Sequence, residues 1–234
     1  MTHRVSRGLS LLGNVVWSKT IDNSSSGTEG STGPANPFNF NASRGPADFD
    51  QKIRANISAN YILPKFNVNH LASAFVNGWQ ANAIIQSQTG LPFTVTSGTD
   101  RSLSGVGNDY ADVVPGQTPQ RPSGVSFHKE YFNTAAFQPA AAGTFGNAHR
   151  NNIFGPGYEE LDGSIFKELF PEKRVHGQFR AEGFNLFNHP NFANPTSAIN
   201  SSTVGQVTTT AAGVSGTGTT GLPRVFQFGA KVVF

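Results

Sequence analysis

The side chains that could do chemistry are scattered along this chain, without catalytic spacing. The sequence holds no cysteine, which excludes thiol catalysis, disulfides and cysteine-based zinc sites. None of the six histidines lies at metal-ligand spacing from another, and His189 precedes Pro190, where a turn role is expected. No Gly-x-Ser-x-Gly elbow, His-Glu-x-x-His pair or Walker loop occurs. We therefore expect no enzyme activity, no cofactor and no metal.

One glycine motif has the formal spacing of a dinucleotide site. Residues 216–221 match Gly-x-Gly-x-x-Gly, but they follow a Gly/Thr-rich stretch and lead into a segment beginning Leu222-Pro223. A dinucleotide site needs a helix at that point. We expect a loop there instead.

The polar residues with regular spacing recur at every second position, which is the period of a β-strand with two unlike faces. Their expected role is to line a wetted surface or to contact a solute or partner; the alternative is that they only solvate the face and pair with one another, for instance Arg180 or Glu182 with Lys231. The candidates on this wetted surface are Arg54, Asn56, Asn60, Gln80, Asn82, Gln86, Gln178, Arg180, Glu182, Gln227 and Lys231.

The elements that carry these residues are expected to be six long antiparallel strands. Period-two alternation predicts them at residues 9–17, 53–63, 79–88, 161–168, 176–184 and 224–234, with only Ile84 off the pattern in the third. The turn at 170–175 is tight and the connection at 63–79 is moderate, whereas those at 19–50, 90–160 and 188–223 are long and rich in Gly, Ser, Thr, Asn and Pro. We expect the long connections to be irregular loops on one rim.

Composition supports an all-β chain whose polar residues are mostly uncharged. Charged residues make up 13% of 234 residues, about half the ~25% of a soluble domain, while Gly (26), Phe (20) and Pro (14) are abundant. The mean hydropathy of −0.29 and the absence of a long apolar run exclude membrane-spanning helices. The net charge of +3 includes no basic run, so nucleic acid is not expected as a partner. A transmembrane β-barrel and a soluble secreted β-sandwich, such as an adhesin or a carbohydrate-binding module, remain.

Loop lengths and aromatic positions favour the barrel. Long loops on one rim and short turns on the other are typical of outer-membrane barrels, which also place aromatic residues at both membrane interfaces. We expect Tyr61 and Trp79 at the short-turn interface and Trp17 and Phe184 at the long-loop interface. The last strand ends in a polar-x-Gly-x-x-apolar-x-Phe pattern formed by Gln227, Gly229, Val232 and Phe234. It is similar to the assembly signal that the outer-membrane insertion machinery reads by strand addition.

Several further segments resemble one family, the TonB-dependent outer-membrane receptors, and within it the Oar-like subgroup that carries a carboxypeptidase-regulatory-like domain. These segments are WSKTID at 17–22, RGPADFD at 44–50, GWQ at 78–80, QTGLPF at 88–93, YFN at 131–133, GPG at 155–157 and FRAEGFNLFNHPNF at 179–192. One departure is Phe154, where a basic residue is expected.

The resemblance implies the C-terminal part of a barrel of about 22 strands in the outer membrane of a Gram-negative-type cell, with long extracellular loops. The whole chain, 1–234, is then one partial barrel domain without the plug, and TonB would act only through that absent plug. The polar candidates would face the lumen, the parent would import a large nutrient, and six strands alone would not transport. The partners expected are membrane lipid, the insertion machinery and the missing strands and plug.

Overall fold

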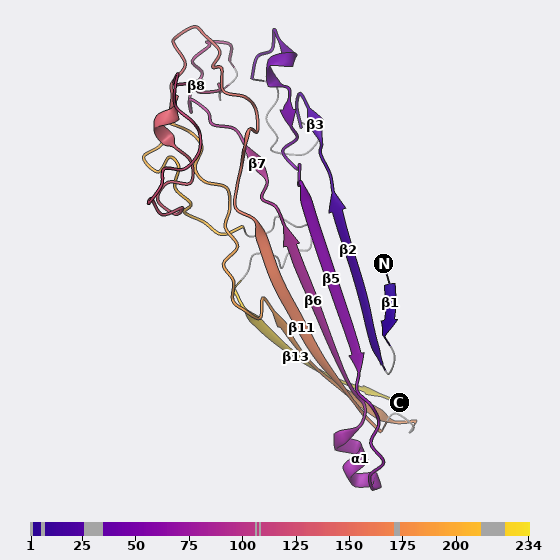
Figure 1. Cartoon of the computed structure of the whole chain (residues 1–234). Coiled ribbons are helices and arrows are strands. Elements are labelled where there is room, and N and C mark those ends of the chain that lie inside the picture. The colour runs from indigo at the N-terminus through magenta and orange to yellow at the C-terminus, as the bar shows by residue number, and fades with distance from the viewer. Residues whose placement is uncertain are drawn as a thin grey trace.

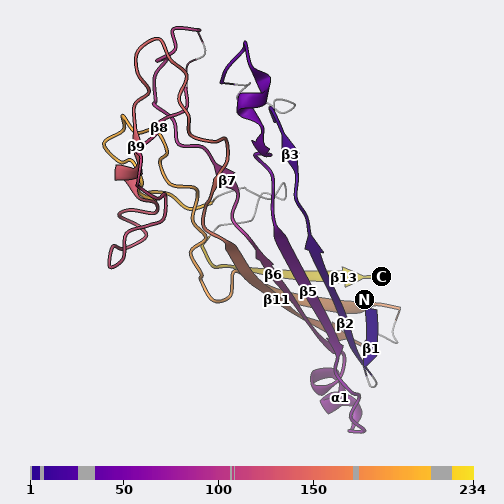
Figure 2. The same cartoon turned by 45° about the horizontal axis from the view of Figure 1, so that its top comes forward.

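A single antiparallel sheet dominates the molecule, which is described by a computed structural model over residues 2–5, 8–25, 35–105, 107, 109–170, 174–211 and 223–234. Within these residues the sheet has seven strands in the order β1-β2-β5-β6-β11-β12-β13. Each strand therefore pairs with the strands of this sheet that come before and after it in the sequence, as in a meander. The strands are β1 (Thr2–Val5), β2 (Leu9–Trp17), β5 (Ile53–Ile62), β6 (Trp79–Gln88), β11 (Tyr158–Leu169), β12 (His176–Phe184) and β13 (Val225–Val233). The sheet twists along its length and is not closed (Figures 1 and 2).

The predicted all-β meander is confirmed, with adjustments to some of its strands. Strands β2, β6 and β12 have the predicted bounds, because alternation runs along their whole length with little interruption. Strand β11 is longer than expected and begins at Tyr158, and β1, too short to show a pattern, adds a seventh strand. It pairs with β2 through a register that joins Val5 to Leu9.

The long-loop rim carries a folded structure, which corrects the expectation of irregular loops. We call the described parts of 18–52, 89–157 and 185–211 the loop cap. Three two-stranded sheets and two 3-10 helices brace it: β3 (Ile21–Asp22) with β4 (Gly45–Pro46), β7 (Pro92–Phe93) with β10 (Ile153–Phe154), β8 (Asp112–Val113) with β9 (Phe137–Gln138), and helices at Phe40–Ser43 and Thr134–Ala136.

The apolar core of the molecule lies in this cap. It is formed by Phe93, Val95, Ala111, Phe132, Ala136, Phe137 and Ala148. Phe132 packs against the rings of Phe93 and Phe137 with centroids 5.7 Å apart in both pairs. Among the buried apolar residues of the described chain, only Tyr158 belongs to the seven-stranded sheet. Loop composition conceals this core because its apolar residues have no regular period.

The opposite rim holds the short connections and one helix. The connection between β5 and β6 folds into α1 (His70–Val76), where Asn69 caps the helix by accepting a hydrogen bond from the Ala72 backbone N–H at 2.8 Å. The indole N–H of Trp79 donates to the carbonyl of Phe75 and ties α1 to β6. The tight turn expected at 170–175 falls largely on residues 171–173, outside the described residues. No helix in the described chain is long and apolar enough to cross a membrane.

Candidate functional site: the polar face of the sheet

The strand register gathers the eleven polar candidates onto one face of the sheet, which we call the polar face. Residues directly opposite on antiparallel strands share a face, and alternate residues along a strand share it too. Asn56 lies opposite Gln86, and Asn60 opposite Asn82. On the other side of β11, Gln178 lies opposite Lys231 and Glu182 opposite Gln227. The same register places Arg54, Gln80 and Arg180 on this face. That the polar face is the lumen-facing one stays a prediction.

Side-chain amides form a hydrogen-bonded ladder across the middle of the polar face. The Asn82 carbonyl oxygen accepts from Asn60 at 2.5 Å and from Gln80 at 3.2 Å, and its amide nitrogen donates to the hydroxyl of Ser164 at 3.2 Å. Nearer the cap, Asn56 donates to Asn14 at 3.1 Å. Strands β2, β5, β6 and β11 are therefore cross-linked by side chains as well as by backbone hydrogen bonds.

The charged candidates pair differently from the expected cross-strand pairing with Lys231. Arg180 forms its ion pair with Glu182 of its own strand at 3.4 Å, and its guanidinium lies 5.3 Å from the ring centroid of Phe166. Lys231 lies opposite Gln178 instead, two positions away from the residue facing Arg180. The register between β12 and β13 therefore keeps Lys231 from lying opposite Arg180 or Glu182.

The other face, which we call the apolar face, presents large hydrophobic side chains to its surroundings. Its exposed members include Val15, Ile57, Ile85, Ile165, Phe179 and Phe228. A contiguous exposed apolar surface marks contact with a membrane or a partner. Leu12, Val16 and Ile84 are exposed apolar residues on the polar face, so the segregation is incomplete.

Lys167 is a cation on the apolar face, against the expectation that strand charges gather on the other one. It lies opposite Trp79 at the short-turn rim, and its ammonium is 5.5 Å from that ring. The ammonium donates to the backbone carbonyls of Asn77 and Glu168 and is 5% exposed. Alternation along β11 places Lys167 on this face, and these carbonyls satisfy its charge.

Three of the four predicted interfacial aromatics share the apolar face. Trp17, 81% exposed, lies at the long-loop end of β2, whereas Tyr61 and Trp79 lie at the short-turn ends of β5 and β6. Phe184 lies on the polar face, opposite Val225, because the alternation that turns Glu182 to that face turns Phe184 there too. The interfacial role of all four stays a prediction.

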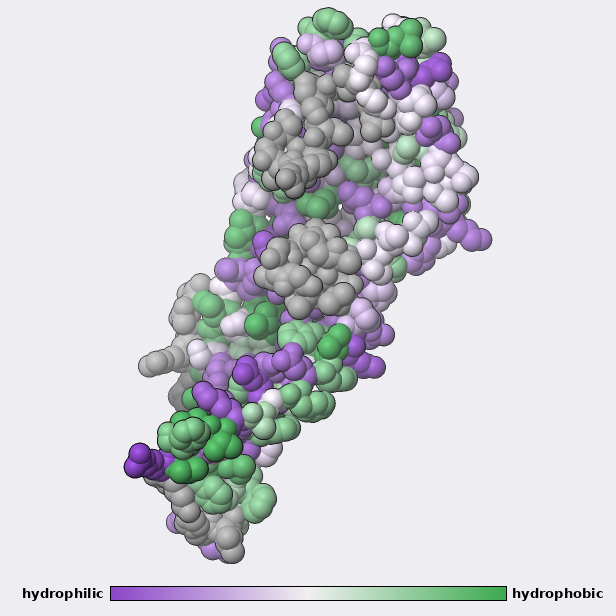
Figure 3. Space-filling view, turned by 180° about the vertical axis from the view of Figure 1, so that it is seen from behind, coloured by the Kyte–Doolittle hydropathy of each residue, from purple (hydrophilic) through white to green (hydrophobic). Residues whose placement is uncertain are grey.

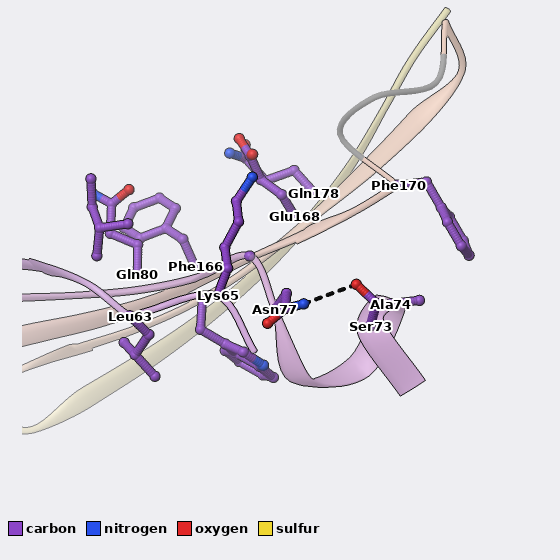
Figure 4. Close-up of a pocket in the computed structure, with 13 residues that line it drawn as sticks. Leu63, Lys65, Ser73, Ala74, Asn77, Gln80, Phe166, Glu168, Phe170 and Gln178 are labelled. Carbon is purple, nitrogen blue, oxygen red and sulfur yellow. Dashed lines mark hydrogen bonds between the residues drawn. The ribbon is translucent and has the colours of Figure 1, made fainter. Parts of the chain in front are cut away.

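A cavity of about 350 Å³ lies at the short-turn end of the polar face (Figure 4). Candidates Gln80 and Gln178 line it together with Phe166, Glu168 and Lys65. Figure 4 shows Lys65 extending toward Glu168 and Gln178. Helix α1 lies beside the cavity, where the side-chain amide of Asn77 donates a hydrogen bond of 2.9 Å to the Ser73 hydroxyl. Apolar side chains gather near this end of the molecule (Figure 3).

The residues of the predicted assembly signal divide between the two faces of β13. Gln227 and Gly229 lie on the polar face, whereas Val232 lies on the apolar face, 64% exposed. Phe234 follows the strand and is 92% exposed. Within the described residues β13 pairs only with β12, so its other backbone edge is open to a further strand.

Sequence reasoning missed a buried arginine that joins two loops of the cap. Arg150, 5% exposed, forms ion pairs with Asp22 and, at 2.7 Å, with Asp48, and also donates to the Ser25 hydroxyl at 2.8 Å. Burial would raise the pKa of Asp22, but the Ser25 hydrogen bond and the guanidinium of Arg150 outweigh it and lower that pKa below its ordinary 3.8. No local pattern could reveal this cluster, because Arg150 and Asp22 are 128 residues apart.

No cluster of three or more His, Cys, Asp or Glu side chains that could hold a metal ion occurs in the portions that the structure describes. The glycine motif at 216–221 lies outside the described residues.

An open antiparallel sheet with one polar and one exposed apolar face, folded loops on one rim and short connections on the other, defines a transmembrane β-barrel protein. Comparison with known families agrees: residues 1–227 match the outer membrane beta barrel domain family, and the chain belongs to it. It is therefore an outer-membrane protein. Neither a curated protein nor a solved structure gave a significant match.

Proposed function

We propose that the chain forms the C-terminal arc of a TonB-dependent receptor of the Oar-like type, whose parent imports a large nutrient. The observation that carries the proposal is the polar face, on which eleven polar residues from four strands form one wetted surface. In a closed barrel this face lines the lumen and contacts the plug or the solute. The chain supplies wall, cap and assembly signal, and has no catalytic role.

The partners follow from the surfaces. The apolar face contacts membrane lipid, and the open edge of β13, with Gln227, Gly229, Val232 and Phe234, meets the barrel-insertion machinery. Further strands and the plug come from the rest of the parent receptor, and TonB acts through that plug. The soluble β-sandwich alternative is less well supported, because a sandwich would bury its apolar face against a second sheet.

Cysteine labelling tests the face assignment, since the chain has no native cysteine and each introduced one is unique. Asn56→Cys and Ile57→Cys are neighbours on opposite faces, as are Gln86→Cys and Ile85→Cys. In outer membranes of the host, a membrane-impermeant maleimide should label the Asn56 and Gln86 variants, and lipid-phase quenchers should reach fluorophores on the Ile57 and Ile85 variants. Equal aqueous labelling of both members of each pair would contradict the barrel.

Energy coupling tests the receptor assignment separately. In cells that carry Gln178→Cys in the intact gene, labelling should change when TonB is deleted or the proton-motive force is collapsed, because the plug then stays in place. Phe228→Cys on the apolar face is the control and should not respond. A barrel whose lumen labelling ignores TonB would be an outer-membrane protein of another kind.

A further inference from the structure

The turn that follows β12 folds onto the apolar face of the sheet at its cap end. Gly163 of β11 and Gly183 of β12 lie opposite each other at apolar-face positions of their strands. A Cβ on Gly163 would lie 2.9 Å from one methyl group of Leu186, and a Cβ on Gly183 would lie 2.5 Å from the other. The ring of Phe226, opposite Gly183 on β13, is 3.0 Å from the same point. Leu186 therefore covers the apolar face where two strands have no side chain.

This turn, residues 185–188, is fixed by its own backbone. Asn185 and Asn188 bracket it in the left-handed conformation, with φ of 48° and 51°, which asparagine tolerates better than most residues. The Asn188 N–H donates to the Asn185 carbonyl at 2.7 Å, and the Leu186 N–H donates to the Leu161 carbonyl of β11 at 2.8 Å. Phe187 is 79% exposed. The turn thus adds an ordered, partly apolar element to the surface of the sheet.

Arg224, the residue before β13, brings a cation to this turn. Its backbone N–H donates to the Asn188 side chain at 3.1 Å, and its guanidinium donates to the Leu186 carbonyl at 3.4 Å. The guanidinium also lies 5.9 Å from the ring centroid of Phe226, within the range of a cation–π contact. Arg224 is exposed, and among the described residues no carboxylate pairs with it. The guanidinium is therefore held in place while most of its five N–H donors face no protein acceptor there.

From Arg224 toward the short-turn rim, aromatic side chains follow the apolar face of β13. Phe226 and Phe228 occupy alternate positions and are 58% and 69% exposed. The Phe228 ring stacks on Phe179 of β12, with centroids 6.4 Å apart and planes 23° apart. This stripe is continuous with the rest of the apolar face. A fixed cation at the head of an exposed apolar stripe matches a molecule with an anionic head and an apolar tail.

We propose that this site binds one membrane lipid with a phosphate-bearing, anionic headgroup. The phosphate contacts the guanidinium of Arg224, and an acyl chain lies along Phe226 and Phe228. Guanidinium groups bind phosphate oxygens through paired, charge-assisted hydrogen bonds. A zwitterionic headgroup carries its own cation, which weakens its attraction to Arg224. The inference rests on the lipid contact of the apolar face given under the proposed function, and it does not depend on TonB.

The test measures lipid preference with the full chain in micelles of a neutral detergent. Ala230→Cys, on the apolar face two residues beyond Phe228, carries a bimane fluorophore on the only thiol of the chain. Brominated phosphatidylglycerol and brominated phosphatidylcholine, which differ in headgroup charge, are the quenching probes. One basic residue near a membrane surface changes the affinity for anionic lipid about fivefold. We expect saturable quenching, with phosphatidylglycerol bound about fivefold more tightly than phosphatidylcholine.

Substitutions made in the labelled chain separate the headgroup contact from the acyl-chain contact. Arg224→Gln should abolish the preference, whereas Arg224→Lys, which keeps the charge, should retain most of it. Phe226→Ala should weaken the binding of both lipids equally. Arg121→Gln is the matched control and should leave the preference unchanged. Arg121 is also exposed and has no ion pair among the described residues, but it lies in the loop cap.

Salt provides a readout that needs no substitution. The preference should fall at high ionic strength, because exposed charges are screened there. A preference that Arg224→Gln abolishes and Arg121→Gln keeps supports the proposal. Equal binding of the two lipids overturns it, as does a preference that survives Arg224→Gln or high salt. Displacement of the lipid by equimolar inorganic phosphate would also overturn it, since a free anion would then suffice.

Failure of this inference is distinct from failure of the receptor assignment. Equal quenching by the two lipids would remove the headgroup site and leave the lipid contact of the apolar face in place. The energy-coupling experiment reports on the polar face and does not depend on lipid preference.

Discussion

Arg150 shows how one side chain can hold a loop structure together. Replacing it with methionine keeps the aliphatic stem but leaves Asp22 and Asp48 without their cation. We expect a loss of about 2–3 kcal/mol of local stability, below the range for a fully buried pair because Asp48 is 41% exposed. Hydrogen exchange of residues 45–48 in the micelle-bound chain measures it. Arg180→Met is the control, since its exposed pair should contribute less than about 1 kcal/mol; equal effects would contradict the role of Arg150.

The lowered pKa of Asp22 predicts an acid-sensitive cap. A carboxyl whose pKa is depressed by folding contributes stability that is fully present above its ordinary pKa of 3.8 and is lost as the pH falls through the lower folded value. Exchange protection around Asp48, corrected for intrinsic rates, should therefore fall below about pH 3.8. Asp22→Asn should flatten that part of the profile; an unchanged profile would show that other groups control the cap.

Residue contacts were predictable where they follow strand spacing and unpredictable where they join distant loops. Two-residue alternation placed Asn60 and Asn82 on one surface, and their hydrogen bond follows from the register. The same rule predicts a polar-face position for Phe184, yet its place near a strand end suggested an interfacial role. The alternation of β11 places Lys167 on the apolar face, opposite Trp79, and the two backbone carbonyls that accept hydrogen bonds from its ammonium are tertiary contacts that the sequence does not reveal.

At the scale of the strand, neighbouring residues lie on opposite faces, so the same charged substitution should have opposite effects at adjacent positions. Ala83 and Ile84 are adjacent in the middle of β6, with Ala83 on the apolar face and Ile84 opposite Asp162 on the polar face. Hydropathy alone ranks Ile84→Arg as the more damaging change. The face assignment predicts the reverse: Ala83→Arg should cost about 2–4 kcal/mol near the membrane midplane, whereas Ile84→Arg gains an acidic neighbour. Outer-membrane yield and urea unfolding in lipid vesicles measure both, and a larger loss for Ile84→Arg would reverse the face assignment.

The C-terminal strand allows a similar test of assembly. Phe234 is almost fully exposed, so Phe234→Gln should leave the folded sheet unchanged and yet lower outer-membrane assembly several-fold, if the insertion machinery reads this residue. Val233→Gln, the preceding residue on the polar face, should assemble normally. Pulse-chase fractionation of the intact parent compares the two, and equal assembly would remove Phe234 from the signal.

Strands with a two-residue period were predicted, most of them to within one residue of their bounds, and shorter elements were not. Strand β6 tolerates one apolar interruption at Ile84 and still reads as a strand over its full length. Strand β1 has four residues, too few for a pattern, and α1 has seven, stabilised by the Asn69 cap and by the contact of Trp79 with Phe75. The cap core has no period at all, because its residues come from separate stretches of one long loop, residues 89–157.

At the scale of the whole molecule, the sheet and the cap stabilise themselves in different ways. The cap has an apolar core of its own, whereas the strands leave their large apolar side chains exposed, which is unfavourable in water and favourable in lipid. The sheet therefore depends on the membrane and on neighbouring strands, and the cap does not. This division predicts that the cap resists protease in detergent better than the strands do.

The seven described strands leave two edges, at β1 and β13, while the smallest membrane barrels need about eight strands. An unpaired edge within the bilayer leaves backbone groups without hydrogen bonds, a cost of several kcal/mol for each group. We therefore expect the 234-residue chain alone, refolded into lipid vesicles, to show no heat-modifiable monomer in electrophoresis and no solute flux, whereas the proposed parent receptor should show a heat-modifiable band. A compact, heat-modifiable monomer that conducts would mean that these strands close by themselves, and it would remove the need for further barrel strands.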